Sequence, residues 1–193
     1  HPERTLGNEA DDLFKSMRNY MESDDPFSFK SLNFSSKKIN IKKFKKPAKQ
    51  NEILVSTIIA DNEAASVEKC INSLGVKAKI KKYLHFEIDA TDRLDINTIV
   101  STDVLFNPSK EYIANIKEES DIYRFLVRSK DDIVGQSLAQ TLQDRFNLSG
   151  LKSIKKGVVW EVKINSSRAK KDVDIILNSH IFSNPISQEC HEY

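Results

Sequence analysis

The sequence predicts an α+β fold in which two strand-helix-strand-helix repeats pair their sheets. The first observation is an internal match, in which Ile80–Ile88 (IKKYLHFEI) and Ile154–Val162 (IKKGVVWEV) share Ile, Lys, Lys and Glu at an offset of 74 residues. The second is that apolar residues alternate along both segments, as in strands with one buried face. The third is that a helical pattern ending near a glycine precedes each segment.

The first repeat is predicted to span residues 51–118. A β-rich run over 53–59 precedes a helix that leads to Gly75, and the strand over 80–88 follows. A second helical pattern then reaches Asn107-Pro108, after which we expect a short strand. The apolar positions that define the two helices are Ala64, Val67, Ile71 and Leu74 in the first, and Leu94, Ile96, Ile99 and Val100 in the second.

The second repeat is predicted to span residues 119–193 with the same element order. A β-rich run over 122–127 precedes a helix expected to end at Gly150, followed by the strand over 154–162. A second helical pattern then reaches Asn184-Pro185. The apolar positions here are Val134, Leu138, Leu142 and Phe146 in the first helix, and Val173, Ile176 and Leu177 in the second. A unit of this size is near the lower limit for a self-sufficient core, so we expect the repeats to form an intramolecular pseudo-dimer.

Two further segments precede the repeats. Residues 1–25 are predicted to hold one helix with Asn8 as N-cap and an apolar stripe that includes Leu13, Phe14 and Met17. Residues 26–50 are predicted to be a lysine-rich linker, with seven lysines between Ser36 and Gln50. This run is compatible with a solvated tether, with a short basic strand or with contacts to phosphates.

Composition narrows the functional classes. The five glycines are too dispersed for a dinucleotide-binding or P-loop motif. No apolar run approaches the roughly 20 residues of a membrane span. Two cysteines without C-x-x-C spacing favour a reducing compartment, so we expect a cytoplasmic protein. The 30 basic and 28 acidic residues nearly balance, which argues against a general nucleic-acid binder.

Within the repeats, the residues suggest little catalytic chemistry. Glu87 and Glu161 fall on the polar strand faces beside lysines and are interpreted as solvated cross-strand partners. His85 shares that face and has no acidic or nucleophilic partner at a recognised spacing. Cys70 is interpreted as core filler on a helix. A metal site at Cys190-His191 with His180 is disfavoured, because adjacent residues of an extended chain point to opposite sides.

The first four residues carry the one candidate catalytic pattern. Pro2 keeps the segment His1-Pro2-Glu3-Arg4 extended, so that His1 and Glu3 project to one side. A carboxylate beside a histidine fixes its tautomer and stabilises the imidazolium, as a general base requires next to a nucleophile. His1 and Glu3 are therefore the predicted catalytic residues, although no nucleophile accompanies them.

Two parts of the chain resemble components of one enzyme. His-Pro-Glu-Arg, followed by Asp12-Leu13-Phe14-Lys15-Ser16, resembles the C-terminal end of the glutaminase (PurQ-like) subunit of phosphoribosylformylglycinamidine synthase. That subunit is a triad glutamine amidotransferase, and the resemblance implies that His1 and Glu3 are the histidine and glutamate of a Cys-His-Glu triad. Its nucleophilic cysteine has no match in this chain. We therefore expect the parent protein to continue upstream.

The repeats resemble the small PurS subunit of the same enzyme. The matching stretches in the second repeat are Gly150–Ile154, the strand with Trp160, and Ile181–Ile186. The resemblance implies ferredoxin-like or PurS-like halves that pair their sheets, and an assembly role in purine biosynthesis. The module would bridge glutaminase and synthetase so that ammonia reaches formylglycinamide ribonucleotide. The complete ligase uses ATP and Mg²⁺. We expect no cofactor or metal site in this chain, and we do not expect the chain to be active alone.

Two alternatives remain open. Tandem strand-helix-strand-helix units also form regulatory modules that bind a small molecule, such as an amino acid, between paired copies. The lysine run could instead contact nucleic acid, although the predicted sheet faces lack the paired aromatic residues on which RNA bases stack.

Overall fold

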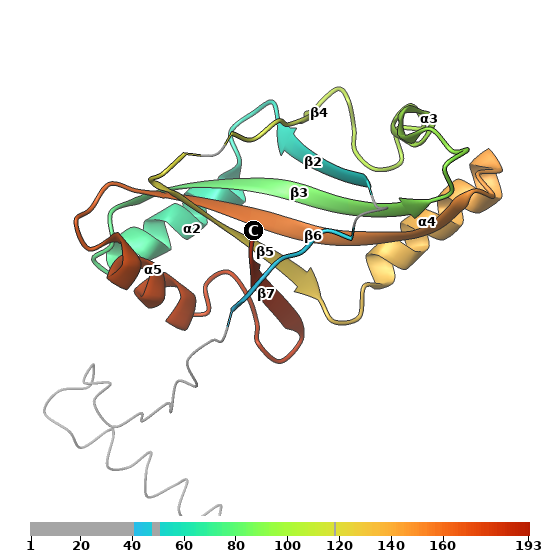
Figure 1. The fold of residues 1–193 in the computed structure, drawn as a ribbon. Coiled ribbons are helices and arrows are strands. Elements are labelled where there is room, and N and C mark those ends of the chain that lie inside the picture. Colours follow the sequence, from blue (N-terminus) through green and yellow to red (C-terminus); the bar gives the residue numbers. More distant parts are fainter. Residues whose placement is uncertain (1–40, 48–50, 118) are drawn as a thin grey trace, which may run out of the picture. The chain divides into compact units, whose positions relative to one another are not determined.

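A seven-stranded sheet organises the described part of the chain, which has a mixed α and β architecture with four helices (Figure 1). The computed structural model describes residues 41–47, 51–117 and 119–193. The strand order is β1-β7-β5-β6-β3-β2-β4. β1 runs parallel to β7, and every other neighbouring pair is antiparallel. The strands are β1 (Lys42–Lys43), β2 (Asn51–Thr57), β3 (Ala78–Ala90), β4 (Glu111–Ile113), β5 (Ile122–Ser129), β6 (Leu151–Ile164) and β7 (Gln188–Glu192).

The two strands that carry the internal match lie side by side at the centre of this sheet. β3 and β6 pair antiparallel, with Ile80 facing Val162 and Ile88 facing Ile154. At the middle of this register Leu84 faces Val158, which lies 74 positions later in the chain. The strand runs expected over 53–59 and 122–127 are present as β2 and β5, and the short strands expected after both Asn-Pro pairs are present as β4 and β7.

The four helices are α2 (Asn62–Ser73), α3 (Ile96–Val100), α4 (Ile133–Phe146) and α5 (Ala169–Asn178). Asp61 caps α2 through the backbone N–H groups of residues 63 and 64, and Asp132 caps α4 through Gly135 N–H. Gly75 adopts the predicted left-handed conformation after α2, with φ +83°. The same expectation for Gly150 was wrong, because Asn147 takes the left-handed position after α4 with φ +54°.

The two Asn-Pro pairs form the same turn. The side chain of Asn107 accepts a hydrogen bond from the N–H of Ser109 at 3.0 Å, and that of Asn184 accepts one from Ile186 at 3.0 Å. In both turns the backbone N–H of the asparagine donates to a side chain four residues later, Glu111 or Gln188, at 2.8 Å. These turns connect α3 to β4 and α5 to β7.

Two apolar clusters on one face of the sheet hold the helices. The first joins α2 and α5 to β3, β5 and β6, with Ile71, Trp160 and Ile176 at its centre. The second joins α3 and α4 to β2, β3 and β6, with Phe86 and Leu142 at its centre. Each cluster therefore draws a helix from residues 51–118 and a helix from residues 119–193. Neither half of the chain supplies a complete core of its own.

The opposite face, which we call the open face, carries no helix residue in its apolar cluster. That cluster consists of Leu54, Tyr83, Leu126 and Val159, with Phe44, Ala114, Ile116 and Tyr193 packed against it. Residues 41–47, which we call the strap, run from the β7 edge across this face toward the start of β2 (Figure 1). The short basic strand, one interpretation of the lysine-rich run, is thus observed at Lys42–Lys43.

None of the helices in the described residues is long and apolar enough to cross a membrane. The helix expected within residues 1–25, with its apolar stripe, lies outside the described residues.

Candidate functional site

The repeated Lys and Glu residues form reciprocal ion pairs on the open face. Lys81 approaches Glu161 at 3.7 Å, and Lys155 approaches Glu87 at 3.4 Å. Each pair joins β3 to β6, and the two pairs lie on either side of the Leu84–Val158 position. We call the surroundings of these carboxylates the Glu87 half and the Glu161 half of the open face. The interpretation of both glutamates as solvated was wrong, since they are only 2% and 5% exposed.

Both carboxylates can be buried because an arginine of β5 also donates a hydrogen bond to each of them. Arg128 donates from Nη2 to Glu87 at 2.8 Å, and Arg124 donates from Nε to Glu161 at 2.8 Å. A buried carboxylate without such donors would be strongly destabilising. The arginines stand four residues apart and project to the same side of one strand. Sequence reasoning missed them, although this spacing within a predicted strand was the available signal.

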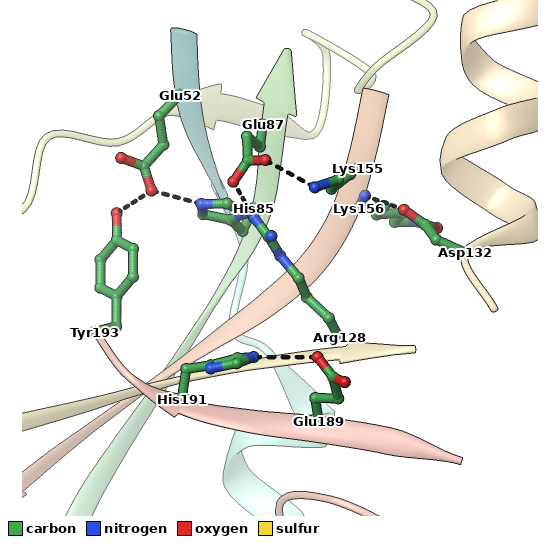
Figure 2. A network of polar contacts seen from close by, with 10 residues as sticks. All are labelled: Glu52, His85, Glu87, Arg128, Asp132, Lys155, Lys156, Glu189, His191 and Tyr193. Atoms are coloured by element: carbon green, nitrogen blue, oxygen red, sulfur yellow. Dashed lines mark hydrogen bonds and ion pairs between the residues drawn. The ribbon is translucent and has the colours of Figure 1, made fainter. Parts of the chain in front are cut away.

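His85 lies at the centre of the Glu87 half and is fully buried (Figure 2). Its Nε2 is 2.5 Å from Oε1 of Glu52, and its Nδ1 is 3.3 Å from Nη2 of Arg128. Because a guanidinium can only donate, Nδ1 must accept and the ring proton belongs on Nε2, directed at Glu52. The sequence offered no acidic partner for His85 at a recognised spacing, and the structure supplies one from β2, 33 residues upstream.

Glu52 links this histidine to the last residue of the chain. The hydroxyl of Tyr193 donates to the same Glu52 oxygen at 2.7 Å. Burial raises the pKa of Glu52, but the hydrogen bonds from His85 and Tyr193 outweigh burial, so the pKa lies below its ordinary value. Burial and the adjacent Glu52 carboxylate raise the pKa of Tyr193. Glu52 is therefore an ionised acceptor shared by His85 and Tyr193.

Aromatic rings cover the Glu87 half. The ring of Phe44, from the strap, stacks on Tyr193 at 5.7 Å and meets the edge of His85 at 5.7 Å. The guanidinium carbon of Arg128 lies 4.9 Å from the centre of the Phe44 ring, a cation–π contact. This cover leaves His85 without access to solvent. The His85–Glu52 pair resembles a catalytic pair in composition, but its partners are Phe44 and Tyr193, so it holds the strap and Tyr193 in place.

The Glu161 half lacks the strap, although its Arg124 and Glu161 side chains are about as buried as Arg128 and Glu87. A hollow of about 290 Å³ lies over Arg124 and Glu161, with Tyr83, Ile116 and Ile122 as its less polar walls. Lys79, Lys81, Lys117 and Lys163 contribute positive charge, and Glu119 contributes a carboxylate. Burial, together with the charge of Glu161, raises the pKa of Tyr83 to about 12, so that its phenol stays neutral. Arg124 also donates from Nη2 to the carbonyl of Lys117 at 2.6 Å.

The remaining candidates from the sequence are separated. His1 and Glu3 lie outside the described residues. On β7, Cys190 packs toward the first apolar cluster while His191 lies 3.4 Å from Glu189. The prediction that Cys70 is core filler was wrong, because it is exposed on α2. In the described part of the chain, no group of three or more His, Cys, Asp or Glu side chains is arranged to hold a metal ion.

The accessible chemistry of the open face is therefore that of binding. His85 is enclosed, and the groups that line the hollow of this face are mainly lysines, with the exposed carboxylate of Glu119 beside them. In comparisons with known proteins, no protein-family model matches this chain, and no curated protein matches it.

Proposed function

We propose that residues 51–193 are a fused pair of PurS-like repeats that serve as an assembly module. The module would bridge the glutaminase and the synthetase of phosphoribosylformylglycinamidine synthase, and ammonia would pass between them to formylglycinamide ribonucleotide. The observation that carries the proposal is the register of β3 and β6, in which Leu84 faces its sequence counterpart Val158. Such a register is expected when two copies of one unit pair about a twofold axis.

Two features of the packing support this arrangement. The Lys81–Glu161 and Lys155–Glu87 pairs exchange the same residue types between the repeats, as an isologous interface does. Each apolar cluster takes one helix from each repeat, so fusion supplies a partner that a single repeat of this size needs. An assembly role also agrees with an open face on which His85 is enclosed and lysines are accessible.

His1 and Glu3 have a conditional role in this proposal. His1 would be the general base and Glu3 its orienting acid in a glutaminase whose cysteine comes from another segment. ATP and Mg²⁺ would be bound by the synthetase and not by the repeats. The purified chain is accordingly expected to release no ammonia from glutamine, and measurable release would contradict this assignment.

The test mixes the purified chain with glutaminase and synthetase subunits from an enzyme of the separate-subunit type. We expect the three to sediment together, and we expect glutamine-dependent amidation to require the chain. Amidation with added ammonia should not require it, because free ammonia reaches the synthetase without a bridge. A chain that sediments alone and leaves the glutamine-dependent rate unchanged would contradict the proposal.

A further inference from the structure

The two halves of the open face carry opposite charge at corresponding positions. The 74-residue offset relates Lys79, Lys81 and Lys163 to Ser153, Lys155 and Asp89. Arg124 and Glu52 also occupy corresponding positions. Arg124 faces Glu161 on the neighbouring strand, as Glu52 faces Glu87. At these related positions, with the glutamates included, the Glu161 half has four cations and one carboxylate. The Glu87 half has one cation and three carboxylates at the same positions. Lys117, Glu119 and Asp121 lie in the Glu161 half without a repeat-related counterpart.

The acidic Glu87 half is covered by a basic extended segment of the same chain. The strap has the sequence Ile41-Lys42-Lys43-Phe44-Lys45-Lys46-Pro47, and its Lys42 and Lys43 pair with β7 at the edge of the sheet. The N–H of Phe44 donates to the carbonyl of Glu192 at 2.6 Å, and its ring enters the half beside His85. Lys46 contributes to the lowered pKa of Glu52. Arg128 adds a cation to this half, but its guanidinium is neutralised by Glu87 and covered by Phe44.

Among residues 41–47, 51–117 and 119–193, no basic segment with an aromatic side chain covers the Glu161 half; Ile116 packs against the apolar cluster there and the carbonyl of Lys117 accepts a hydrogen bond from Arg124. The hollow of this half, about 290 Å³, has an aromatic wall, Tyr83, and an aliphatic wall, Ile116, above the Arg124–Glu161 pair. The lysines at its rim are accessible, with the Lys79 and Lys81 side chains 81% and 71% exposed. Lys79 pairs with Glu68, and Lys163 pairs with Glu119 and Asp121. Exposed pairs of this kind are weak, so an incoming carboxylate can replace them at little cost.

We propose that the Glu161 half binds an extended acidic segment of a protein partner, with an aromatic or large apolar side chain of that segment in the hollow. The acidic segment would cover the basic Glu161 half, as the basic strap covers the acidic Glu87 half. Carboxylates would meet Lys79, Lys81 and Lys163, and the inserted ring would lie over the Arg124 guanidinium as Phe44 lies over Arg128. Extended segments are commonly recognised at sheet edges and in adjacent side-chain pockets.

A protein segment fits this half better than a phosphate backbone does. The hollow contains a buried carboxylate, Glu161, directly beside Arg124, which would oppose a phosphate placed there. Its walls Tyr83, Ile116 and Ile122 suit an apolar side chain. The inference rests on the repeat relation in the proposed function, but it does not depend on which enzyme the partner belongs to.

The test uses the full 193-residue chain and a charge-inverted copy of strap residues 41–46, the peptide Ile-Glu-Glu-Phe-Glu-Glu. Titration is followed by the amide chemical shifts of the chain in ¹H–¹⁵N spectra. We expect saturable shifts in residues 79–83 and 122–124. The Phe-to-Ala peptide should bind about tenfold more weakly, because an apolar ring no longer enters the hollow. The Lys-containing original, Ile-Lys-Lys-Phe-Lys-Lys, should produce no saturable shift in these residues.

Matched variants distinguish the two halves. Lys81→Gln should raise the Kd roughly three- to fivefold, as expected for loss of one exposed charge pair. Lys155→Gln removes the corresponding lysine from the Glu87 half and should leave the Kd unchanged. Equal effects of the two substitutions, or absence of saturation, would overturn the proposal. Equivalent shifts with a single-stranded oligonucleotide, inorganic phosphate or free glutamate would also overturn it and would assign the hollow to that ligand class.

The outcomes separate this inference from the assembly proposal. Co-sedimentation with the enzyme subunits but no peptide binding would overturn the acidic-segment site alone. Peptide binding without co-sedimentation would overturn the proposed enzyme and retain the site.

Discussion

The Glu87 and Glu161 halves of the open face contain the same repeated sequence motif but differ in what covers it. Each has a buried glutamate held by an arginine of β5 and a lysine of the neighbouring strand. In the Glu87 half, Phe44 and Tyr193 cover the charges. In the Glu161 half, a hollow remains over them. The repeated residues thus maintain the join between β3 and β6, and the residues that differ determine what each half can bind.

Replacing the arginines should give the largest difference in the free energy of unfolding between variants of the two halves. Arg128→Ala leaves Glu87 buried under Phe44 with one exposed lysine as partner, so we expect a loss of about 3–5 kcal/mol in the free energy of unfolding. Arg124→Ala should cost less, about 1–3 kcal/mol, because water can enter the hollow and solvate Glu161. Urea unfolding followed by Trp160 fluorescence measures both. Equal losses would contradict the difference in cover.

Gly157 and Tyr83 occupy corresponding positions and provide the second comparison. A Cβ at Gly157 would lie 2.9 Å from the Leu126 side chain and 3.0 Å from the carbonyl oxygen of Val127. Gly157→Ala should therefore lower the free energy of unfolding by about 1–3 kcal/mol. The same urea titration checks this value. A neutral or stabilising alanine would show that the Glu87 half has room for a side chain there, as the Glu161 half has.

The cover itself should contribute a smaller amount. Phe44→Ala removes the stacking on Tyr193 and the cation–π contact to Arg128, with an expected loss of about 1–2 kcal/mol. Phe44→Leu keeps apolar volume and should recover only part of this loss. If leucine restores full stability, the ring acts only through its volume, and the aromatic contacts add nothing.

The smallest expected effect is the pH-dependent contribution of Glu52 to the free energy of unfolding. Because the folded-state pKa of Glu52 is lowered, its stabilisation is complete above its unfolded-state pKa, about 4.3, and is lost as pH falls through the folded-state value. Urea unfolding of the wild type and of Glu52→Gln should therefore differ at pH 7 and converge below about pH 4. A difference that is independent of pH would show that the Glu52 charge does not stabilise the fold.

Much of the fold could be predicted from local patterns. The 74-residue offset and the strict alternation located β3 and β6, and apolar spacing located all four helices. Gly75 ended α2 as expected, whereas Asn147 replaced glycine after α4 because asparagine also tolerates positive φ. Local patterns could not show that each core takes helices from both repeats, since that depends on which strands become neighbours.

The open face was harder to predict for the same reason. His85, Glu52 and Tyr193 are far apart in the chain and meet only because β2, β3 and the residue after β7 converge. The glutamates looked solvated because lysines flank them, but the partners that permit their burial, Arg124 and Arg128, come from a third strand. Charged residues on a strand face are therefore poor indicators of exposure when the neighbouring strand is unknown.

The central claim is that residues 51–193 form one cooperative unit in which two repeats share a sheet and two cores. Native-state hydrogen exchange of the full chain tests it most directly, by comparing the slowest amides of β3 with those of β6. We predict that both strands exchange at one common free energy, equal to that of global unfolding. Two separate values, with one repeat opening while the other stays protected, would contradict the claim.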